Sequence, residues 1–581
     1  MSMNKLFALL LTLALVVTSF ASCQQQPPSV TTPAKTSTEA TSDLSTTVPE
    51  VPDVPVVSNG ILLSSVLFST DGSTLHSFAA TELAWYLSQK GITVVGEDAE
   101  DEVKAAAYPI TLVTDATIAE GGYKIDAAET GLTLAGGDAR GLAWGLYNLL
   151  EKVVGVHFYA SDTIVIDKDP VVIEWGVLDE FAPTFTVLRN PWQPIEALAE
   201  KNGGNAVYHE NAFKTLTLDT LVGDSANSQP CLTSTENLTK AITFAKEFLT
   251  KYPSLKVLTF APAPGIEKPC TCNACTALEA TENSSTGAYI LFINAIIEAI
   301  AADYPTLSFE VMMGGCFLSV PTSARLPEGV SVCISTADCH ATHPLTDENC
   351  PSSVDFVNAL TGWCNIASVR LEYVLSSTEY LATFANIYTL RENMRLFAEV
   401  GIDSFYCRGN FSCPSGEFGE LRAYLVGKLL QDPLMSEEEY IAHMSDFLSA
   451  YYGGGWFYVL GYINKVTELA NNEVFEKNTC GQSATDTPLT AITREEYRAY
   501  VYQFENYWNA AAALAGDRAD AVQSSRVQCQ YMQLCVNPNV TDAQALIQTV
   551  SSIGLCWRQG MRSVNAGAEL IASPTRWTYA P

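Results

Sequence analysis

The chain has 581 residues, of which 64 are acidic and 32 basic, so its formal net charge is −32 at pH 7. Binding of nucleic acid needs clustered Lys and Arg, and this charge balance therefore excludes nucleic acid as a partner and disfavours adhesion to anionic lipid. Hydrophobic residues make up 48% of the chain, which at this length allows a large core and two or three domains.

The first residues have the pattern of an export signal. Lys5 supplies a positive charge, an apolar run follows over residues 6–17, and small residues precede Cys23. The run is shorter than the roughly 20 residues that a membrane-spanning helix needs. The segment resembles a bacterial lipoprotein signal of residues 1–22, in which Cys23 is lipidated and becomes the new N-terminus. Cleavage nearby by an ordinary signal peptidase, giving a freely secreted protein, is the alternative.

A Pro/Ser/Thr-rich stretch follows over residues 23–57 and lacks the periodic apolar residues that a core needs. We interpret it as a linker that holds a folded body away from the membrane. No other stretch looks long and apolar enough to span a bilayer. We therefore expect an exported protein, lipid-anchored to the outer face of the bacterial cell membrane or secreted, that contacts the membrane only through its N-terminal anchor.

Residues 58–179 predict a small α/β domain. Strands are expected over 61–68, 109–113, 122–125 and 132–136. A helix is expected over 74–91, with an apolar stripe of Phe78, Leu83, Trp85 and Leu87, and a second over 141–153 that ends at Gly155. Strands that alternate with helices indicate a mixed sheet with helices on one side.

Residues 180–432 repeat a strand–loop–helix pattern. The expected strands are 185–188, 206–208, 256–260, 308–313, 330–335, 367–374 and 403–407, and the long helices are 237–249, 288–302, 380–400 and 418–430. This alternation predicts a (β/α)₈ TIM-like barrel. A doubly wound sheet is the competing fold, but no Gly-rich dinucleotide fingerprint follows any strand. Residues 433–581 predict a helical C-terminal domain, with helical spacing over 434–452, 466–470, 494–515 and 542–553.

Two parts of the chain resemble known bacterial proteins. The segment from Arg140 to Tyr159 is similar to the end of the small α/β domain that precedes the catalytic barrel in α-glucuronidases and hexosaminidase-like enzymes. The middle resembles an exported domain of unknown function that follows such an N-terminal domain. The matching pieces are 229–233, the Cys270/Cys272/Cys275 cluster, 292–294, 304–305, 326–330, 362–363, 372–373, 419–425, 428–430 and 451–453. The resemblance spans about residues 60–470 and implies a glycoside hydrolase-like TIM barrel, but no particular substrate.

One departure from the family pattern concerns catalysis. Members often carry an Asn-Asp pair between a strand and the cysteine cluster, whereas this chain has residues 260–265 without a carboxylate before Glu267. If that acid is catalytic in the family, this chain is an altered or inactive member.

Hydrolysis of a glycosidic bond needs two carboxyl groups, which in a barrel lie at the C-terminal ends of strands. Glu372 is the first candidate, because it shares one face of its strand with Arg370; a buried ion pair is the alternative. Its partner is expected among three further acids. Asp338 lies in the loop after the strand ending at Ser335, with His340 nearby; an ordinary polar loop is the alternative.

The other two candidate acids differ in their surroundings. Glu310 lies in an apolar strand where desolvation could raise its pKa as a general acid requires, although its early place in the strand suits a structural role. Glu417 is expected to face the pocket, whereas Glu420 is expected to lie on a helix near Arg422 and Lys428 in a solvated or capping role.

Sugar binding needs aromatic platforms and polar groups that make paired hydrogen bonds. The residues that follow or flank the expected strands and could serve are Arg189, Trp192, His209, Trp363, Arg370, Tyr373, Arg408 and Asn410. Arginines at strand ends could clamp the carboxylate of a uronic acid. Neutralisation of neighbouring acids is the alternative for each of them.

The chain has 16 cysteines, and one group of them is tightly spaced. Cys270, Cys272 and Cys275, together with Cys231, could form a four-thiolate zinc site. Two local disulfides or buried free thiols are the alternatives. We expect no catalytic metal, because there are only 6 His, and no cofactor, because glycoside hydrolysis needs none.

The sequence thus predicts an extracellular glycoside hydrolase that acts on oligo- or polysaccharide, including uronic-acid-containing glycans, by paired-carboxylate chemistry. A non-catalytic glycan-binding surface lipoprotein that uses the same pocket is the alternative. The oligomeric state stays open.

Overall fold

The computed structural model describes residues 59–160, 162–189, 213–223, 227–402, 404–409, 417–471, 483, 486 and 489–555, with the backbone alone for 186–189. The export signal, the linker and Cys23 lie outside the described residues.

The first part of the described chain forms a six-stranded mixed sheet in the order β10-β5-β6-β4-β2-β3. Strands β10, β5 and β6 are antiparallel neighbours, while β6, β4, β2 and β3 run parallel. The bounds are β2 Ser65–Ser69, β3 Thr93–Val94, β4 Tyr108–Thr114, β5 Tyr123–Ala128, β6 Gly131–Gly136 and β10 Gly176–Phe181. Two antiparallel pairs accompany it, β1 Gly60–Leu62 with β9 Val172–Glu174 and β7 Val156–Ala160 with β8 Thr163–Ile166. The mixed sheet is confirmed, and the single strand expected over 61–68 is two short strands.

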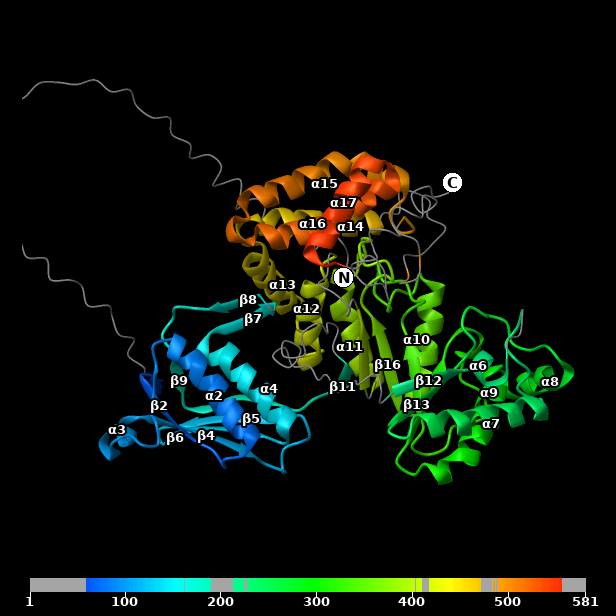
Figure 1. The fold of residues 1–581 in the computed structure, drawn as a ribbon, viewed down its shortest axis with the longest axis horizontal. Coiled ribbons are helices and arrows are strands. Elements are labelled where there is room, and N and C mark those ends of the chain that lie inside the picture. Colours follow the sequence, from blue (N-terminus) through cyan, green and yellow to red (C-terminus); the bar gives the residue numbers. More distant parts are fainter. Residues whose placement is uncertain are drawn as a thin grey trace, which may run out of the picture. The chain divides into compact units, whose positions relative to one another are not determined.

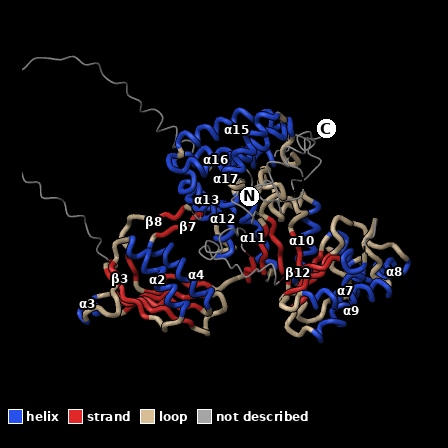
Figure 2. The backbone as a smooth tube through the Cα atoms, in the orientation of Figure 1, coloured by secondary structure: helices blue, strands red, loops and turns tan. Residues whose placement is uncertain are grey.

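Two helices, α2 (Thr74–Gln89) and α4 (Ala139–Leu149), contact this sheet and each other, as Figures 1 and 2 show. Both bury leucines against the strands, and α3 (Asp101–Ala106) buries none of its residues. Of the apolar stripe expected on α2, Leu83 and Leu87 are buried as predicted. The prediction is wrong for Phe78 and Trp85, which are 51% and 54% exposed.

The ends of α4 follow from residues next to it. The Asp138 carboxylate caps its start by accepting hydrogen bonds from the backbone N–H groups of Gly141 (2.7 Å) and Gly121 (3.0 Å). After α4, one π-helical turn over Leu150–Val154 leads to Gly155, which has φ +78°. This left-handed conformation favours glycine, so the predicted C-terminal cap is confirmed.

The second part contains a parallel sheet of seven strands in the order β11-β17-β16-β15-β14-β13-β12. The bounds are β11 Thr186–Arg189, β12 Phe213–Thr217, β13 Val257–Ala261, β14 Ser308–Met313, β15 Ser331–Ser335, β16 Val369–Val374 and β17 Ser404–Arg408. Neighbours follow chain order from β12 to β17, and β11 pairs with β17, as in a barrel. No pairing of β11 with β12 and no eighth strand occurs among the described residues, so a closed (β/α)₈ barrel stays a prediction.

Helices connect these strands and pack on the sheet. They are α6 Leu218–Val222, α7 Thr235–Lys251, α8 Asn273–Glu282, α9 Thr286–Ile300, α10 Pro351–Cys364 and α11 Leu390–Val400. The helical stretch Thr286–Asp303, which contains α9, is by length and composition apolar enough to cross a membrane, which corrects the expectation that no such stretch follows the leader. Most of the side chains of α9 are buried in the core around the parallel sheet, as expected for a core helix.

Helix α12 and the five helices described after it, which belong to the C-terminal region, pack one on the next in chain order. They are α12 Gly419–Gln431, α13 Glu437–Tyr452, α14 Trp456–Ala470, α15 Arg494–Leu514, α16 Ala519–Val536 and α17 Val540–Ile553. Capping boxes start two of them, Ser436 with Glu439 and Thr493 with Glu496. One hydrophobic core joins buried residues of these helices, such as Tyr462 and Trp508, to the parallel sheet.

The ion pair between Glu151 and Lys428 joins residues far apart in the chain and has side chains only 17% and 8% exposed. Burial alone would raise the pKa of Glu151, but the charges of Lys428, His157 and His443 outweigh burial and lower it below its usual range.

We predict that Glu151→Gln lowers the free energy of unfolding by about 3 kcal/mol at neutral pH, because Lys428 loses its partner. The folded-state pKa is lowered, so the contribution of Glu151 is present above its unfolded pKa of about 4.3 and disappears as pH falls through the folded value. Urea unfolding from neutral pH to below pH 4 should show the two proteins converging in acid, with Glu97→Gln, at an exposed position, as the control. A difference that stays constant with pH would contradict this.

Candidate functional site

Charged and polar side chains occupy alternate positions of β13 to β17 on one face of the parallel sheet. We call this the polar face; it comprises Thr259, Glu310, Cys333, Arg370, Glu372, Tyr406 and Arg408. The strand register places Thr259 beside Glu310, Cys333 beside Arg370 and Glu372 beside Tyr406. The intervening residues, such as Val311, Leu371 and Phe405, are buried in the core. The predicted alternation of Arg370 and Glu372 with apolar neighbours is confirmed.

A bidentate ion pair forms the deeper layer of the polar face. Arg370 donates from Nε to Oε1 of Glu310 (2.7 Å) and from Nη2 to Oε2 (2.9 Å), and the Thr259 hydroxyl also donates to Oε2 (2.9 Å). The guanidinium also lies over the Tyr406 ring, 5.5 Å from its centroid, and contacts the Cys333 sulfur at 2.9 Å. Both carboxylate oxygens of Glu310 are therefore used within the protein.

This arrangement changes the interpretation of two predicted residues. Glu310 was a candidate proton donor, but its side chain is 8% exposed and both oxygens accept hydrogen bonds, so we assign it to positioning Arg370. Arg370 neutralises Glu310, which is the alternative that the sequence left open, rather than standing free to clamp a substrate. Burial raises the pKa of the adjacent Cys333 thiol to about 12 against the opposing effect of Arg370, so the thiol stays protonated.

Glu372 lies one layer nearer the carboxyl end of the sheet. Its Oε1 is 3.6 Å from Nη1 of Arg408, and the two side chains are 14% and 24% exposed. On the polar face it is the acid that remains partly accessible, while Glu310 beneath it is not. The carboxyl end of parallel strands is where α/β enzymes place their active sites.

The loop after β15 starts next to Glu372. Ser335 pairs with Glu372 in the sheet, and the Thr336 N–H donates to the Glu372 carbonyl oxygen at 3.0 Å. Asp338 follows two residues later and is exposed. This loop therefore brings a second carboxyl group to the same edge of the sheet.

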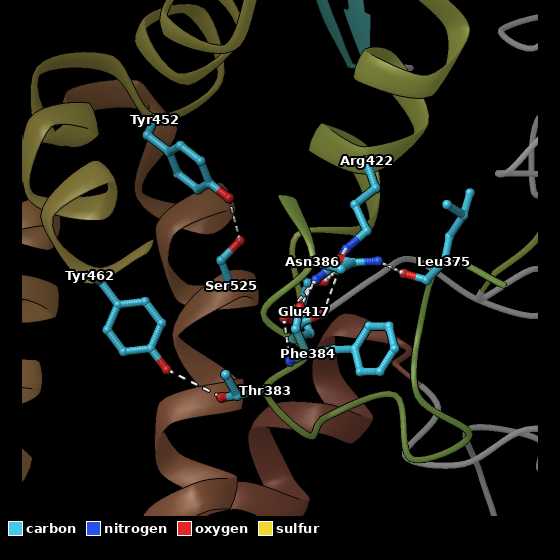
Figure 3. A network of polar contacts seen from close by, with 9 residues as sticks. All are labelled: Leu375, Thr383, Phe384, Asn386, Glu417, Arg422, Tyr452, Tyr462 and Ser525. Carbon is cyan, nitrogen blue, oxygen red and sulfur yellow. Dashed lines mark hydrogen bonds and ion pairs between the residues drawn. The ribbon is translucent and has the colours of Figure 1, made fainter. Parts of the chain in front are cut away.

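Glu417 lies in a buried polar network, shown in Figure 3. Its carboxylate pairs with Arg422 (Nη2 to Oε1, 2.9 Å) and accepts a hydrogen bond from the Phe384 N–H at 3.0 Å. Arg422 also donates to the Asn386 side-chain oxygen at 2.5 Å and to the Phe384 carbonyl oxygen. The Asn386 amide in turn donates to the Leu375 carbonyl oxygen at 3.2 Å.

The expectation that Glu417 faces a pocket is therefore wrong, because its side chain is 5% exposed and fixes the loop after β16 to the start of α12. Glu420 lies in the first turn of α12, on a helix as expected, but it is buried, so of its two expected roles the solvated one is wrong. The next residue after Glu417, Phe418, has a left-handed φ of +48° and stacks on Trp508, with 6.3 Å between ring centroids.

Two predicted aromatic platforms do not reach the polar face. Trp363 on α10 is 1% exposed and donates its indole N–H to the Leu318 carbonyl oxygen at 2.7 Å. Tyr373 is 3% exposed, and its hydroxyl accepts a hydrogen bond from Asn393 on α11. Both side chains belong to the core, because their strand or helix turns them away from the polar face.

The remaining predicted binding residues are Arg189, Trp192, His209, Arg408 and Asn410. Trp192, His209 and Asn410 lie outside the described residues, as do the side chain of Arg189 and the strand expected over 206–208. On the side of β13 away from β14 the neighbouring strand is β12, and His209 precedes β12 in the chain. Of the two predicted binding residues that lie on the polar face, Arg408 is the more exposed, at 24% against 11% for Arg370. Tyr406 lies on the polar face but was not predicted. It could have been found from sequence, because side chains two residues apart in a strand share a face and Arg408 was already a candidate.

Two groups of side chains among the described residues could hold a metal ion. One is the predicted set Cys231, Cys270, Cys272 and Cys275. The other, which the sequence did not reveal as a group, joins His340, His343 and Cys350 in the segment after β15. In each group the ligand atoms lie within 4.8 Å of one another. None of the cysteines in the described part of the chain is paired in a disulfide.

These features define a mixed α/β protein with a parallel sheet whose carboxyl end carries an accessible acid and an arginine. Residues 219–464 match the family model described as "Domain of unknown function (DUF4838)". No curated protein sequence matches the chain.

Several solved glycoside hydrolases resemble the chain weakly. They include a "GH138 enzyme targeting pectin rhamnogalacturonan II" (11% identity, TM-score 0.34, covering 88% of this chain and 93% of that one). The β-N-acetylhexosaminidase from Bacteroides fragilis NCTC 9343 has 9% identity and a TM-score of 0.34, covering 66% and 90%. CpGH84B has 10% identity and a TM-score of 0.39, covering 91% and 99%. Likenesses of this size do not assign an activity.

We predict that Glu417→Ala lowers the free energy of unfolding by about 3 to 5 kcal/mol, because it leaves the buried Arg422 guanidinium unpaired. Glu399→Ala, at an exposed position on α11, should change it by less than about 0.5 kcal/mol. Denaturant unfolding of the two variants measures this difference. A Glu417→Ala variant of normal stability would contradict the structural role and return Glu417 to the candidate acids.

Proposed function

We propose that this chain is a glycoside hydrolase-like protein that acts on oligo- or polysaccharide at the carboxyl end of its parallel sheet. The observation that carries the proposal is the Glu372–Arg408 pair, because it provides a partly accessible carboxylate on a face whose other acid is fully paired. Glu372 is one of the two carboxyl groups that hydrolysis needs. Asp338, on the loop that starts beside Glu372, is the proposed partner.

The roles of the two acids follow from their surroundings. The Arg408 guanidinium beside Glu372 suits the charge of a carboxylate, and a carboxylate acts as a nucleophile or as a base that activates water. Protonation of the leaving oxygen then falls to Asp338. The Asp338 proton passes to the glycosidic oxygen as the bond to the anomeric carbon breaks. Water adds its hydroxyl group to the anomeric carbon, and the remaining water proton passes to Glu372 or, if a glycosyl–Glu372 intermediate forms first, to Asp338.

Arg408 supports a preference for acidic sugars. Its side chain is 24% exposed, and Nη1 lies 3.6 Å from Oε1 of Glu372. The remaining N–H groups could bind a substrate carboxylate in the bidentate manner that arginine favours. Uronic-acid-containing glycans are therefore the substrate class that we place first.

A second candidate function, glycan binding without hydrolysis, is favoured by a specific observation. Glu310 and Glu417 are each held by an arginine in a buried pair, so neither is free to serve as the second acid. If Asp338 does not complete the pair, the polar face retains Arg408 and Glu372 as polar groups for binding alone.

We predict that Glu372→Gln lowers kcat on a cleaved glycan by about 100- to 10,000-fold and that Asp338→Asn lowers it by a similar factor. Hydrolysis of aryl glycosides and of neutral and uronic-acid-containing polysaccharides should be measured, with binding followed by calorimetry in parallel. Asp355→Asn, at an exposed position on α10, is the matched control and should leave kcat unchanged. Binding without turnover by the unmodified protein, unaffected by Glu372→Gln, would select the second candidate; full turnover by Glu372→Gln would reject the assignment of Glu372.

We further propose that the chain is exported and anchored through lipidated Cys23, with the 23–57 segment as its linker. In a detergent phase-partition experiment on cells that express the full chain, the protein should enter the detergent phase, because acyl chains add membrane affinity with each buried methylene group. Cys23→Ser should move it to the aqueous phase. Partition into the aqueous phase without the substitution would indicate free secretion.

A further inference from the structure

Four cysteine side chains converge beside the parallel sheet. Cys231 precedes α7, while Cys270, Cys272 and Cys275 lie between β13 and the first turn of α8. The Sγ atom of Cys231 is 3.6 Å from that of Cys272 and 3.8 Å from that of Cys275. All four sulfur atoms lie within 4.8 Å of one another.

These separations match one kind of metal site. With Zn–S bonds of about 2.3 Å, tetrahedral geometry places the sulfur atoms about 3.8 Å apart. A disulfide would require about 2.05 Å between two sulfurs. The separations of 3.6 and 3.8 Å therefore fit thiolates around a shared zinc ion, and they are too long for bonded pairs.

The two segments that supply the sulfurs are held together by other contacts as well. Gln229, which is 1% exposed, donates from its amide to the carbonyl oxygens of Ala263 (2.9 Å) and Ile266 (2.7 Å) and accepts from the Ala263 N–H (2.9 Å). Its backbone N–H also donates to the Lys268 carbonyl oxygen at 2.7 Å. These bonds fix Cys231, two residues on, against the loop that carries the other three cysteines.

Polar groups around the sulfurs suit negative charge. The Thr233 hydroxyl lies 3.3 Å from the sulfur of Cys275 and 3.4 Å from that of Cys231, and the Cys275 N–H points to the sulfur of Cys272 at 3.5 Å. Cys272 is the N-terminal cap of α8, where the helix dipole favours a thiolate. Outer hydrogen bonds of this kind orient ligands at metal sites.

We propose that Cys231, Cys270, Cys272 and Cys275 bind one Zn²⁺ ion in a closed structural site that fastens the 229–233 segment to the β13–α8 loop. Four protein ligands leave no open position for water, so the ion stabilises the fold and takes no part in hydrolysis. This site is independent of the proposed function. It does determine the path of a loop that leaves the carboxyl end of β13, on the edge of the sheet where Glu372 lies.

The metal content of the purified full chain tests the proposal. Elemental analysis after exhaustive dialysis should find about one zinc per chain, released when the thiols are modified by an organomercurial. Cys272→Ser should lower the zinc content about tenfold, whereas Cys272→His should retain it because histidine is also a zinc ligand. Cys316→Ser, at a cysteine outside the group, is the matched control and should keep the zinc.

The second group of potential ligands provides a further control. His343→Ala removes a ligand from the His340/His343/Cys350 group and should leave the zinc content unchanged. Loss of the ion in His343→Ala with retention in Cys272→Ser would overturn the proposal, as would two disulfides without zinc, seen as an intact mass about four hydrogens lower. Bound iron with strong visible absorption would overturn the assignment of zinc. Because every readout is metal content or mass, inactivity towards glycans does not affect the result.

Discussion

The pair between Glu310 and Arg370 sets the character of the polar face. Burying two charges is favourable only when their remaining hydrogen-bonding groups are satisfied, and here Thr259, Cys333 and Tyr406 complete the arrangement. The deeper layer of this face is thereby neutralised and closed. Glu372, one layer higher, is left as the acid that solvent can reach, and the proposed chemistry depends on that division.

A second arginine organises the loops above the sheet. Arg422 binds Glu417, Asn386 and the Phe384 carbonyl oxygen, so that one guanidinium holds together the loop after β16 and the start of α12. Of the four acids proposed from the sequence, Glu310 and Glu417 are thus held in buried ion pairs with arginines. The remaining two are Glu372 on β16 and Asp338 on the loop that follows the neighbouring strand β15.

The positions of β11 and of β13 to β17 could be predicted from sequence because apolar residues run or alternate along each strand, and β14 has the predicted bounds 308–313. Strand β12 (Phe213–Thr217) was not predicted, because polar Lys and Thr residues interrupt its apolar pattern. The helix predicted over 380–400 begins only at Leu390, because buried Leu381 and Phe384 mimic a helical stripe while the backbone around them bonds to Glu417 and Arg422. The site was predicted in part. Alternation along β16 correctly places Arg370 and Glu372 on one face, whereas pairing partners such as Glu310 with Arg370 are 60 residues apart and invisible to local patterns.

The left-handed backbone conformation of Phe418 limits which residues can occupy this position. A bulky residue in that conformation carries a conformational penalty on the order of 1 kcal/mol, which the aromatic stack with Trp508 has to offset. Glycine would remove the penalty but also the ring. The residue that follows the buried Glu417 carboxylate thus packs on an aromatic side chain of α15, a helix far along the sequence. Substitution of either Phe418 or Trp508 by a residue without an aromatic ring removes the stack. The C-terminal helices therefore help to hold the loops that follow the parallel strands.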